Sequence, residues 1–332
     1  MNNSILNDLL KQYEQKRITN TRNLENRKKE LYLSNPQLQE IDDKLSKLSI
    51  NTAKLILQDN SKSYLEDLKK DIEKLKKEKS ELLKKLNVSE DFLLMHYDCN
   101  ICKDTGYIFE NEKTTMCNCL KQKIYNIEYN QKNINNIDNQ TFDNFNINLF
   151  SDKVDEKKYN TNVSPRENII DIKKSAENFI NNFDTLETKN LIFSGGTGLG
   201  KTFLSNCIVN ELLKQGKTVM YQTAPVMLEN LISDLFSKPE NQTGISNNLL
   251  TVDLLVIDDL GTETMNSMKF TELYKIINTR LLNQNGKSLK TIISTNLDLK
   301  GLFNTYDERL VSRFIGYYDI YRFYGDDIRL KK

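Results

Sequence analysis

The stretch from Gly195 to Thr202 has the residue types and spacing of a phosphate-binding loop. It reads GGTGLGKT and matches G-x-x-x-x-G-K-[ST] in full, after a predicted strand and before a predicted helix. Lys201 would reach the β- and γ-phosphates of a nucleotide, and Thr202 would hold Mg²⁺. Backbone N–H groups and the start of the helix would form the anion cradle, from Gly195, Gly196, Thr197, Gly198, Leu199 and Gly200. The alternative is a glycine-rich turn without a ligand.

Two acidic residues follow an almost continuously apolar strand, LLVIDDLG. Asp258 would hold Mg²⁺, through water, and Asp259 would orient an attacking water. A later strand, TIISTN, ends in Asn296, at the sheet edge where ligands bind, and its amide could position the same water. The alternatives are helix or turn caps for the acids and a turn-forming role for Asn296.

Four of the five cysteines gather in one short segment. Their order is C-x₂-C, fourteen residues, then C-x-C, which is close to a zinc-ribbon spacing. Four thiolates complete a tetrahedral Zn²⁺ site and leave no open position, so the site would be structural. A segment of about thirty residues builds no core of its own, so the metal would supply its folding energy. The predicted ligands are Cys99, Cys102, Cys117 and Cys119.

Other roles for these thiols stay open at this point. An iron–sulfur cluster would use the same four ligands, and a redox pair would use only C-x-x-C, here without a thioredoxin-like setting. His96, the single histidine, lies three residues before Cys99 and is either a ligand, a group supporting one, or a bystander, which we favour. Cys207 follows the phosphate loop on a predicted helix, where we expect it in the core.

The C-terminal half must position the nucleotide residues, and its pattern predicts a parallel α/β sheet. Predicted helices start at residues 164, 201, 224, 268 and 308, the first of them with Ser164 as N-cap and Glu167 closing a capping box. Strands alternate with these helices. The five predicted strands cover residues 190–195, 217–223, 252–261, 290–296 and 317–325.

The N-terminal region is of a different kind. Residues 1–87 contain one proline, no glycine and dense charge, and 58–62 has the composition of a turn. Apolar residues spaced by three, four and seven predict two or three long helices packed as an antiparallel hairpin, with a parallel dimeric coiled coil or a solvated spacer as alternatives. The seam consists of Leu38, Ile41, Leu45 and Leu48, then Leu65, Leu68, Ile72, Leu75, Leu82 and Leu86.

Length and composition limit the remaining possibilities. A chain of 332 residues favours several domains, which we place at 1–88 (helical hairpin), 89–122 (zinc module), 123–163 (linker) and 164–332 (ATPase). The net charge is only +1, so any contact with nucleic acid must be local. No signal sequence and no run of 18 apolar residues is present, so we expect a cytoplasmic protein with reduced thiols that does not enter a membrane.

The order of these motifs resembles the AAA+ ATPases, and more narrowly the bacterial replicative helicase loaders of the DnaC and DnaI type. The resemblance covers roughly residues 140–332 and includes ERLVSRF and RFYGDDIR near the C-terminus. By this resemblance, Asn296 matches sensor 1 and Arg313 matches an arginine finger that reaches the γ-phosphate bound to a neighbouring subunit. Arg309 lies one turn before Arg313, and Arg329 matches the sensor 2 arginine. A solvated surface charge is the alternative for each arginine.

The resemblance implies an ATP-dependent loader that places a hexameric replicative helicase on single-stranded DNA, with ATP, Mg²⁺ and Zn²⁺ bound and self-association driven by ATP. Residues 1–122 would dock the helicase. Asp259 stands where most AAA+ proteins have glutamate, so hydrolysis is expected to be slow. Three residues follow Arg329, so we expect no helical lid. The alternatives are a transposition-helper ATPase of the IstB type and a nucleotide-binding adaptor with little hydrolysis.

Overall fold

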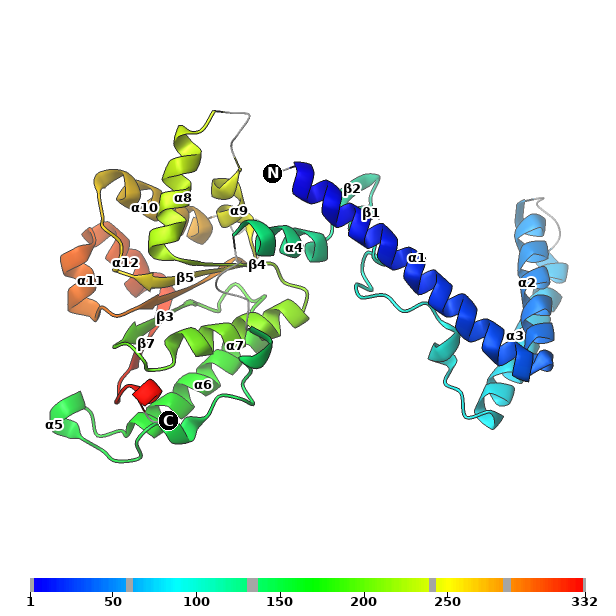
Figure 1. The fold of residues 1–332 in the computed structure, drawn as a ribbon, viewed down its shortest axis with the longest axis horizontal. Coiled ribbons are helices and arrows are strands. Elements are labelled where there is room, and N and C mark those ends of the chain that lie inside the picture. Colours follow the sequence, from blue (N-terminus) through cyan, green and yellow to red (C-terminus); the bar gives the residue numbers. More distant parts are fainter. Residues whose placement is uncertain (1–2, 58–61, 130–136, 239–242, 283–287, 331–332) are drawn as a thin grey trace. The chain divides into compact units, whose positions relative to one another are not determined.

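The computed structural model describes residues 3–57, 62–129, 137–238, 243–282 and 288–330. Contacts divide the chain into two compact units (Figure 1). The smaller unit is Leu10–Lys113, and the larger unit combines Met1–Leu9 with Thr114–Lys332. Each unit is described here by itself.

Long helices make up most of the smaller unit: α1 (Asn3–Ser34) from Leu10 onward, α2 (Pro36–Leu57) and α3 (Lys62–Lys85). Helices α2 and α3 pack on each other as the predicted hairpin, and a short helix η1 (Glu90–Leu93) closes its end. Leu38 and Leu83 are buried against Leu93. The side chain of Leu65 and residues 58–61 of the expected turn lie outside what the structure describes. The helical hairpin is confirmed, and the dimeric coiled coil stays an untested alternative.

The described part of the larger unit contains a five-stranded sheet, as predicted, and every pairing in it is parallel. The strand order is β4-β5-β6-β3-β7. Because β3, β6 and β5 are successive neighbours, the residues at their carboxyl ends meet at one edge of the sheet. The strands are β3 (Asn190–Gly195), β4 (Val219–Thr223), β5 (Leu254–Leu260), β6 (Lys290–Thr295) and β7 (Tyr318–Phe323).

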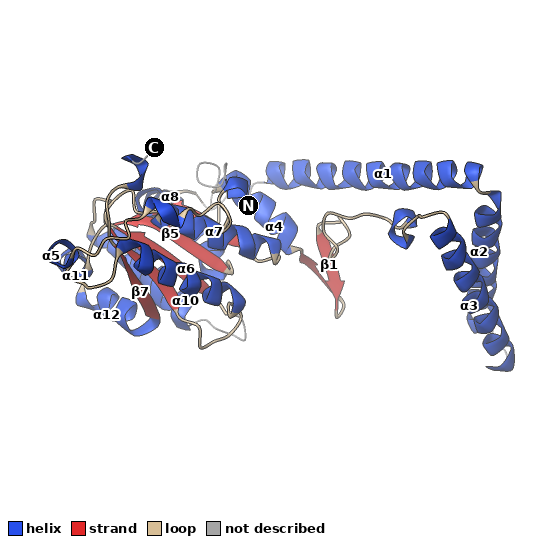
Figure 2. Ribbon diagram, turned by 90° about the horizontal axis from the view of Figure 1, so that it is seen from below, coloured by secondary structure: helices blue, strands red, loops and turns tan. Residues whose placement is uncertain are grey.

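Helices cover both faces of this sheet (Figure 2). One apolar core lies beneath α6 (Pro165–Asn181) and α7 (Lys201–Lys214). The other face packs on α8 (Ala224–Phe236), α9 (Ile245–Thr251), α10 (Ser267–Leu282), α11 (Leu299–Thr305) and α12 (Glu308–Tyr317). The predicted capping box is present: Glu167 N donates to Ser164 Oγ at 3.2 Å, and Ser164 N donates to a Glu167 carboxylate oxygen at 3.0 Å. Helices α9 and α11 were not expected, because each spans only seven residues.

The stretch expected as a linker, residues 123–163, differs from that expectation. It contains most of α4 (Asn118–Glu128), the short helices η2 (Ile137–Asn139) and η3 (Ile147–Leu149), and α5 (Glu156–Tyr159). Phe145 and Phe150 are buried in the same core as α6 and α7. Burial of aromatic side chains of this size contributes free energy that a solvent-exposed linker would not gain. The segment therefore packs as part of the larger unit.

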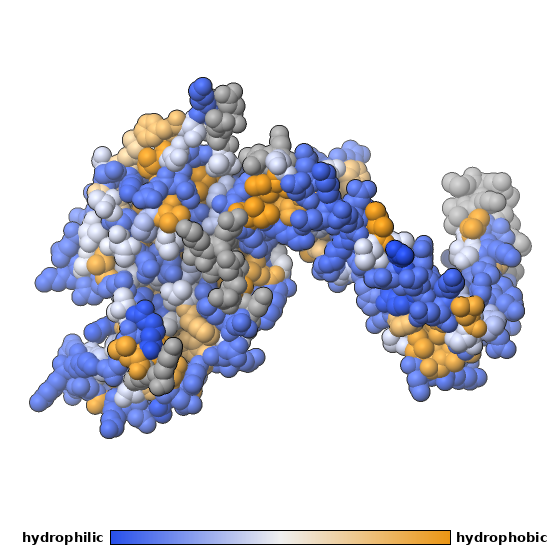
Figure 3. Space-filling view, in the orientation of Figure 1, coloured by the Kyte–Doolittle hydropathy of each residue, from blue (hydrophilic) through white to orange (hydrophobic). Residues whose placement is uncertain are grey.

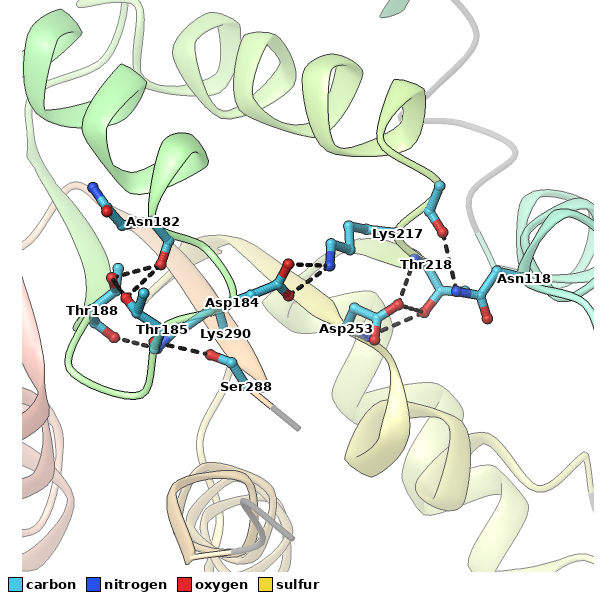
Figure 4. Close-up of polar contacts among 11 residues, drawn as sticks. Asn118, Asn182, Asp184, Thr185, Thr188, Lys217, Thr218, Asp253, Ser288 and Lys290 are labelled. Atoms are coloured by element: carbon cyan, nitrogen blue, oxygen red, sulfur yellow. Dashed lines mark hydrogen bonds and ion pairs between the residues drawn. The ribbon is translucent and has the colours of Figure 1, made fainter. Parts of the chain in front are cut away.

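Helix α4 also provides hydrogen-bond partners for the backbone of the outermost strand, β4. Strand β4 ends the sheet, which leaves backbone groups without a strand partner. The Gln122 side chain replaces one: Val219 N donates to Gln122 Oε1 at 2.6 Å, and Gln122 Nε2 donates to Val219 O at 3.0 Å. Asn118 Nδ2 donates to Gly216 O at 3.0 Å, just before the strand (Figure 4).

Polar side chains hold the amino ends of the strands together (Figure 4). Asp253 accepts from both the N–H and the hydroxyl of Thr218, at 2.8 and 2.7 Å. The buried amine of Lys290 donates to Thr185 O at 3.0 Å and to Thr188 O. These contacts lie at the edge opposite to the phosphate loop, so they support the sheet and leave the other edge available for chemistry.

The surface is mostly hydrophilic on the face shown in Figure 3, in keeping with a charged fraction of 28%. Within the described ranges, no helix is both long and apolar enough to cross a membrane.

Candidate nucleotide-binding site and cysteine cluster

The loop between β3 and α7 can be built only with glycine at key positions. At Gly198 the backbone φ is +70°, and a Cβ would lie 1.8 Å from Asp327 Oδ1. At Gly195 a Cβ would lie 2.2 Å from the carbonyl oxygen of Phe323 on β7. Side chains at either position would push the loop off the C-terminal segment or off the neighbouring strand, so these glycines fix the shape of the cradle.

Lys201 is buried at the centre of the loop, with 6% of its surface exposed. Its Nζ donates to Gly195 O at 2.6 Å, Gly196 O at 2.7 Å and Asn296 Oδ1 at 2.9 Å. Burial lowers the pKa of the amine, and the carboxylates of Asp259 and Asp258 act against this. The structure therefore brings Lys201 and Asn296, two of the predicted site residues, into direct contact.

Asp258 meets Thr202 across the sheet edge. Thr202 Oγ1 donates to Asp258 Oδ2 at 3.2 Å. Tyr221 OH donates to the same oxygen at 2.8 Å, and Ser294 Oγ donates to Asp258 Oδ1. A hydroxyl and a carboxylate side by side are hard oxygen donors of the kind Mg²⁺ accepts. The donor set therefore fits the predicted magnesium position.

Asp259 adopts an unusual backbone conformation, with φ +55°. The pairing of β5 with β6 is irregular between Ile257 and Leu260, and Asp259 N donates to Ser294 Oγ at 3.1 Å. Burial raises the pKa of the Asp259 carboxyl, the neighbouring Asp258 raises it further, and Lys201 lowers it. A left-handed residue with a perturbed carboxyl next to a phosphate loop is typical of a functional position.

The C-terminal segment lies on the phosphate loop. Ile328 N donates to Gly198 O at 2.9 Å. Arg329, which is mostly exposed, pairs with Asp327 through Nε at 3.0 Å and Nη2 at 2.7 Å. A cavity of about 430 Å³ opens beside the loop, lined among others by Gly196 and Asn296. Residues 327–329 are thus next to the loop, where the resemblance expects a sensor arginine.

The other two predicted arginines lie on α12 and contact side chains of α10. Arg313 Nε donates to Asn278 Oδ1 at 3.0 Å, and the Arg309 guanidinium lies 5.9 Å from the ring centre of Tyr274. Arg309 also pairs with Asp307 at the start of α12. Since Tyr274 and Asn278 are four residues apart on α10, the two arginines share one face of α12, as expected from their spacing.

The four clustered cysteines are brought together as predicted. Their sulfur atoms all lie within 4.8 Å of one another, and the group comprises Cys99, Cys102, Cys117 and Cys119 without His96. In a tetrahedral site with Zn–S bonds of about 2.3 Å, neighbouring sulfurs are roughly 3.8 Å apart. None of the four is in a disulfide. The donor set and its spacing therefore fit zinc.

Tight turns shape this cluster. Asp104 is buried and accepts from Cys99 N at 2.9 Å and from Asp98 N at 3.1 Å. Cys117 is the N-cap of α4, and a hairpin of β1 (Tyr107–Glu110) and β2 (Lys113–Met116) joins the two pairs. Cys207 is fully buried in the sheet core, where burial raises its pKa to about 12, so its predicted core role is confirmed.

Two residues of the nucleotide site were missed by the motif analysis. Tyr221 lies in the interior of β4, and its neighbours in the sequence, KTVMYQT, carry only a strand signal. Ser294 belongs to the STN segment, from which only Asn296 was chosen. A signal was available for Ser294, because a serine near the carboxyl end of a strand predicted to be buried needs a polar partner.

Fold and site define the class of this protein. A phosphate loop follows β3, the acidic strand β5 is separated from it by β6, and β7 lies on the other side, which is the sheet of the AAA+ ATPases. The larger unit therefore has the strand order of the AAA+ fold. More narrowly, residues 153–317 match the family described as IstB-like ATP binding protein.

Several curated relatives are named replicative helicase loader DnaC. The chain is 32% identical over 144 residues to the replicative helicase loader DnaC of Buchnera aphidicola subsp. Schizaphis graminum (strain Sg), which covers 42% of this chain and 54% of that protein. It is 29% identical over 139 residues to the replicative helicase loader DnaC of Escherichia coli (strain K12), with the same two coverages. The chain spans about half the length of the curated relatives it matches.

Solved structures show distant likenesses. The crystal structure of the DnaC helicase loader is 22% identical, covers 55% of this chain and 97% of that chain, and has a TM-score of 0.42. The crystal structure of DnaI is 22% identical, covers 48% and 86%, and has a TM-score of 0.41.

Proposed function

We propose that this protein is an ATP-dependent loader of the replicative DNA helicase onto single-stranded DNA, acting in the cytoplasm. The meeting of Lys201, Asn296 and the Thr202–Asp258 pair at one sheet edge carries the nucleotide part of this proposal. The similarity to proteins named replicative helicase loader DnaC supports the loader part.

In this proposal the residues divide the work of hydrolysis. Lys201 and the backbone of 195–200 bind the phosphates, and Thr202 and Asp258 hold Mg²⁺, which would neutralise phosphate charge when bound. Asp259 and Asn296 orient the attacking water. Lys201 must first exchange its carbonyl partners Gly195 and Gly196 for phosphate oxygens. That exchange is favourable because a buried ammonium gains more from anionic oxygens than from neutral carbonyls.

Three arginines complete the proposed site. Arg329 would sense the nucleotide from the segment that already covers the loop, after leaving Asp327. Arg313, together with Arg309, would reach the γ-phosphate bound to a neighbouring copy. Both arginines lie on the face of α12 that contacts α10. In this proposal they act in an assembly formed with ATP.

The cysteine cluster would hold one structural Zn²⁺. We further propose that the predicted division of the N-terminal part, a hairpin over 1–88 and a zinc module over 89–122, serves to dock the hexameric helicase.

The match to IstB-like proteins supports a second candidate, a transposition-helper ATPase. The cysteine-bearing N-terminal region argues against it, because such helpers are not expected to carry that region. Affinity capture of a purified hexameric helicase by this protein separates the two: a loader retains the helicase, whereas a transposition helper does not. A third candidate, an adaptor with little hydrolysis, is separated by steady-state ATP turnover.

A further inference from the structure

Tyr221 is a buried hydroxyl donor in the nucleotide site. It lies within β4 and is 1% exposed, and its hydroxyl donates to Asp258 Oδ2 at 2.8 Å. Burial and the neighbouring Asp258 raise the pKa of this hydroxyl well above its usual value. Through this bond the phenol is a donor to the carboxylate that would hold Mg²⁺.

Asp258 is held from both sides. Its Oδ1 accepts from Ser294 on β6, and its Oδ2 accepts from Tyr221 on β4. These two strands flank β5, so the carboxylate is clamped by its two neighbours in the sheet. Thr202 reaches the same Oδ2 from α7 at 3.2 Å. A hydroxyl can donate its proton and offer a lone pair at once, so Thr202 can serve a cation while it keeps this bond.

We propose that Tyr221, with Ser294, is a positioning residue for Mg²⁺ in this site. Each fixes one oxygen of Asp258, so that the carboxylate meets the metal in a single orientation. The inference rests on the proposed nucleotide-binding function. Partners that orient a metal-binding side chain contribute about 10–100-fold to metal affinity or activity. Tyr221→Phe keeps the ring, and with it the packing, and removes only the donor.

The test measures equilibrium binding of a fluorescent ATP analogue while Mg²⁺ is varied, with a parallel series in EDTA. For Tyr221→Phe, the Mg²⁺ concentration at half-saturation should rise about tenfold, while affinity in EDTA stays within about twofold of the wild type. Ser294→Ala should show the same Mg²⁺-specific defect, and the double variant should exceed either. Tyr318→Phe is the matched control, because Tyr318 is equally buried in the same sheet and its hydroxyl bonds to Thr291.

The possible results distinguish the positioning role of Tyr221 from the proposed nucleotide-binding function. Unchanged Mg²⁺ dependence in both single variants, with tight binding by the wild type, overturns the positioning role and leaves the nucleotide site intact. An equal loss of affinity with and without Mg²⁺, together with lowered thermal stability, also overturns it and assigns Tyr221 to the core. A wild-type protein that binds no nucleotide under any condition refutes the proposed function itself.

Discussion

At the residue scale, the chemistry of the site follows from where a few polar groups are forced together. Lys201 is the clearest case, since within the described ranges its buried ammonium donates to two carbonyls and to the Asn296 amide oxygen. Such a site favours an anion, because phosphate oxygens would accept hydrogen bonds from both the ammonium and the backbone N–H groups of the loop.

Replacing Lys201 by alanine should therefore weaken ATP binding by at least about tenfold, since the charge that meets the phosphates is lost. Isothermal titration of the purified variant gives the affinity. Lys214→Ala, an exposed lysine at the other end of the same helix, should bind like the wild type. Equal affinities in all three proteins would remove Lys201 from the site.

Asp259 should matter for hydrolysis and not for binding. Asp259→Asn removes the carboxylate that would orient water, and we expect turnover at saturating ATP to fall about 10²-fold with binding retained. Steady-state phosphate release measures the rate. If the variant hydrolyses ATP as fast as the wild type, another group orients the water.

The pH dependence of turnover should follow the same carboxyl. Its pKa is raised by burial and by Asp258, so its protonated, inactive form persists to higher pH than for an ordinary aspartate. Turnover should therefore fall on acidification at a pH above the usual range near 4. The pH–rate profile of the wild type tests this, and the low residual rate of Asp259→Asn should lack that acidic limb.

At the element scale, strands and helices with strong apolar periodicity were predictable, and short elements held by tertiary contacts were not. The five strands and the helix starting after Ser164 followed from local sequence. The packing of residues 137–150 did not, because Phe145 and Phe150 become buried only when distant helices are present. In the same way, motifs located Asp258, whereas its contact with Tyr221 depends on two strands becoming neighbours.

Arg280 illustrates how much stability one such contact carries. It is fully buried, and its guanidinium donates to the carbonyl oxygens of Leu249, Val252 and Lys290. Arg280→Met would leave these acceptors without a donor, and we expect a loss of at least about 3 kcal/mol in the free energy of unfolding. Urea unfolding followed by circular dichroism measures it.

The exposed Lys174→Met on α6 is the control for that measurement, with an expected change under about 0.5 kcal/mol. A loss below about 1 kcal/mol for Arg280→Met would show that the carbonyls find other partners.

At the scale of the whole molecule, the cysteine cluster and the nucleotide site should respond independently to mutation. Cys102→Ser removes one of four thiolates, so the variant should lose its zinc and the local fold around it, because the metal supplies folding energy. Elemental analysis and ATP affinity are measured together, and the affinity should persist. Metal-replete wild-type protein without zinc would contradict the assignment.

Assembly should need Arg313. A guanidinium supplied by a neighbouring subunit can raise turnover by about 10³–10⁵. Arg313→Ala should bind ATP almost normally, yet fail in ATP-dependent assembly. Mixing Lys201→Ala with Arg313→Ala should restore part of the hydrolysis, since some interfaces pair an intact loop with an intact arginine. No recovery in mixed assemblies would place Arg313 outside a shared site.

The central claim is that ATP controls the binding of this protein to a replicative helicase. The most direct test is a mass measurement of this protein mixed with the hexameric helicase of its source organism, with and without ATP. The account predicts a defined complex that forms with ATP and is weakened by Lys201→Ala. Absence of any complex under both conditions, while the wild-type protein binds ATP, would contradict it.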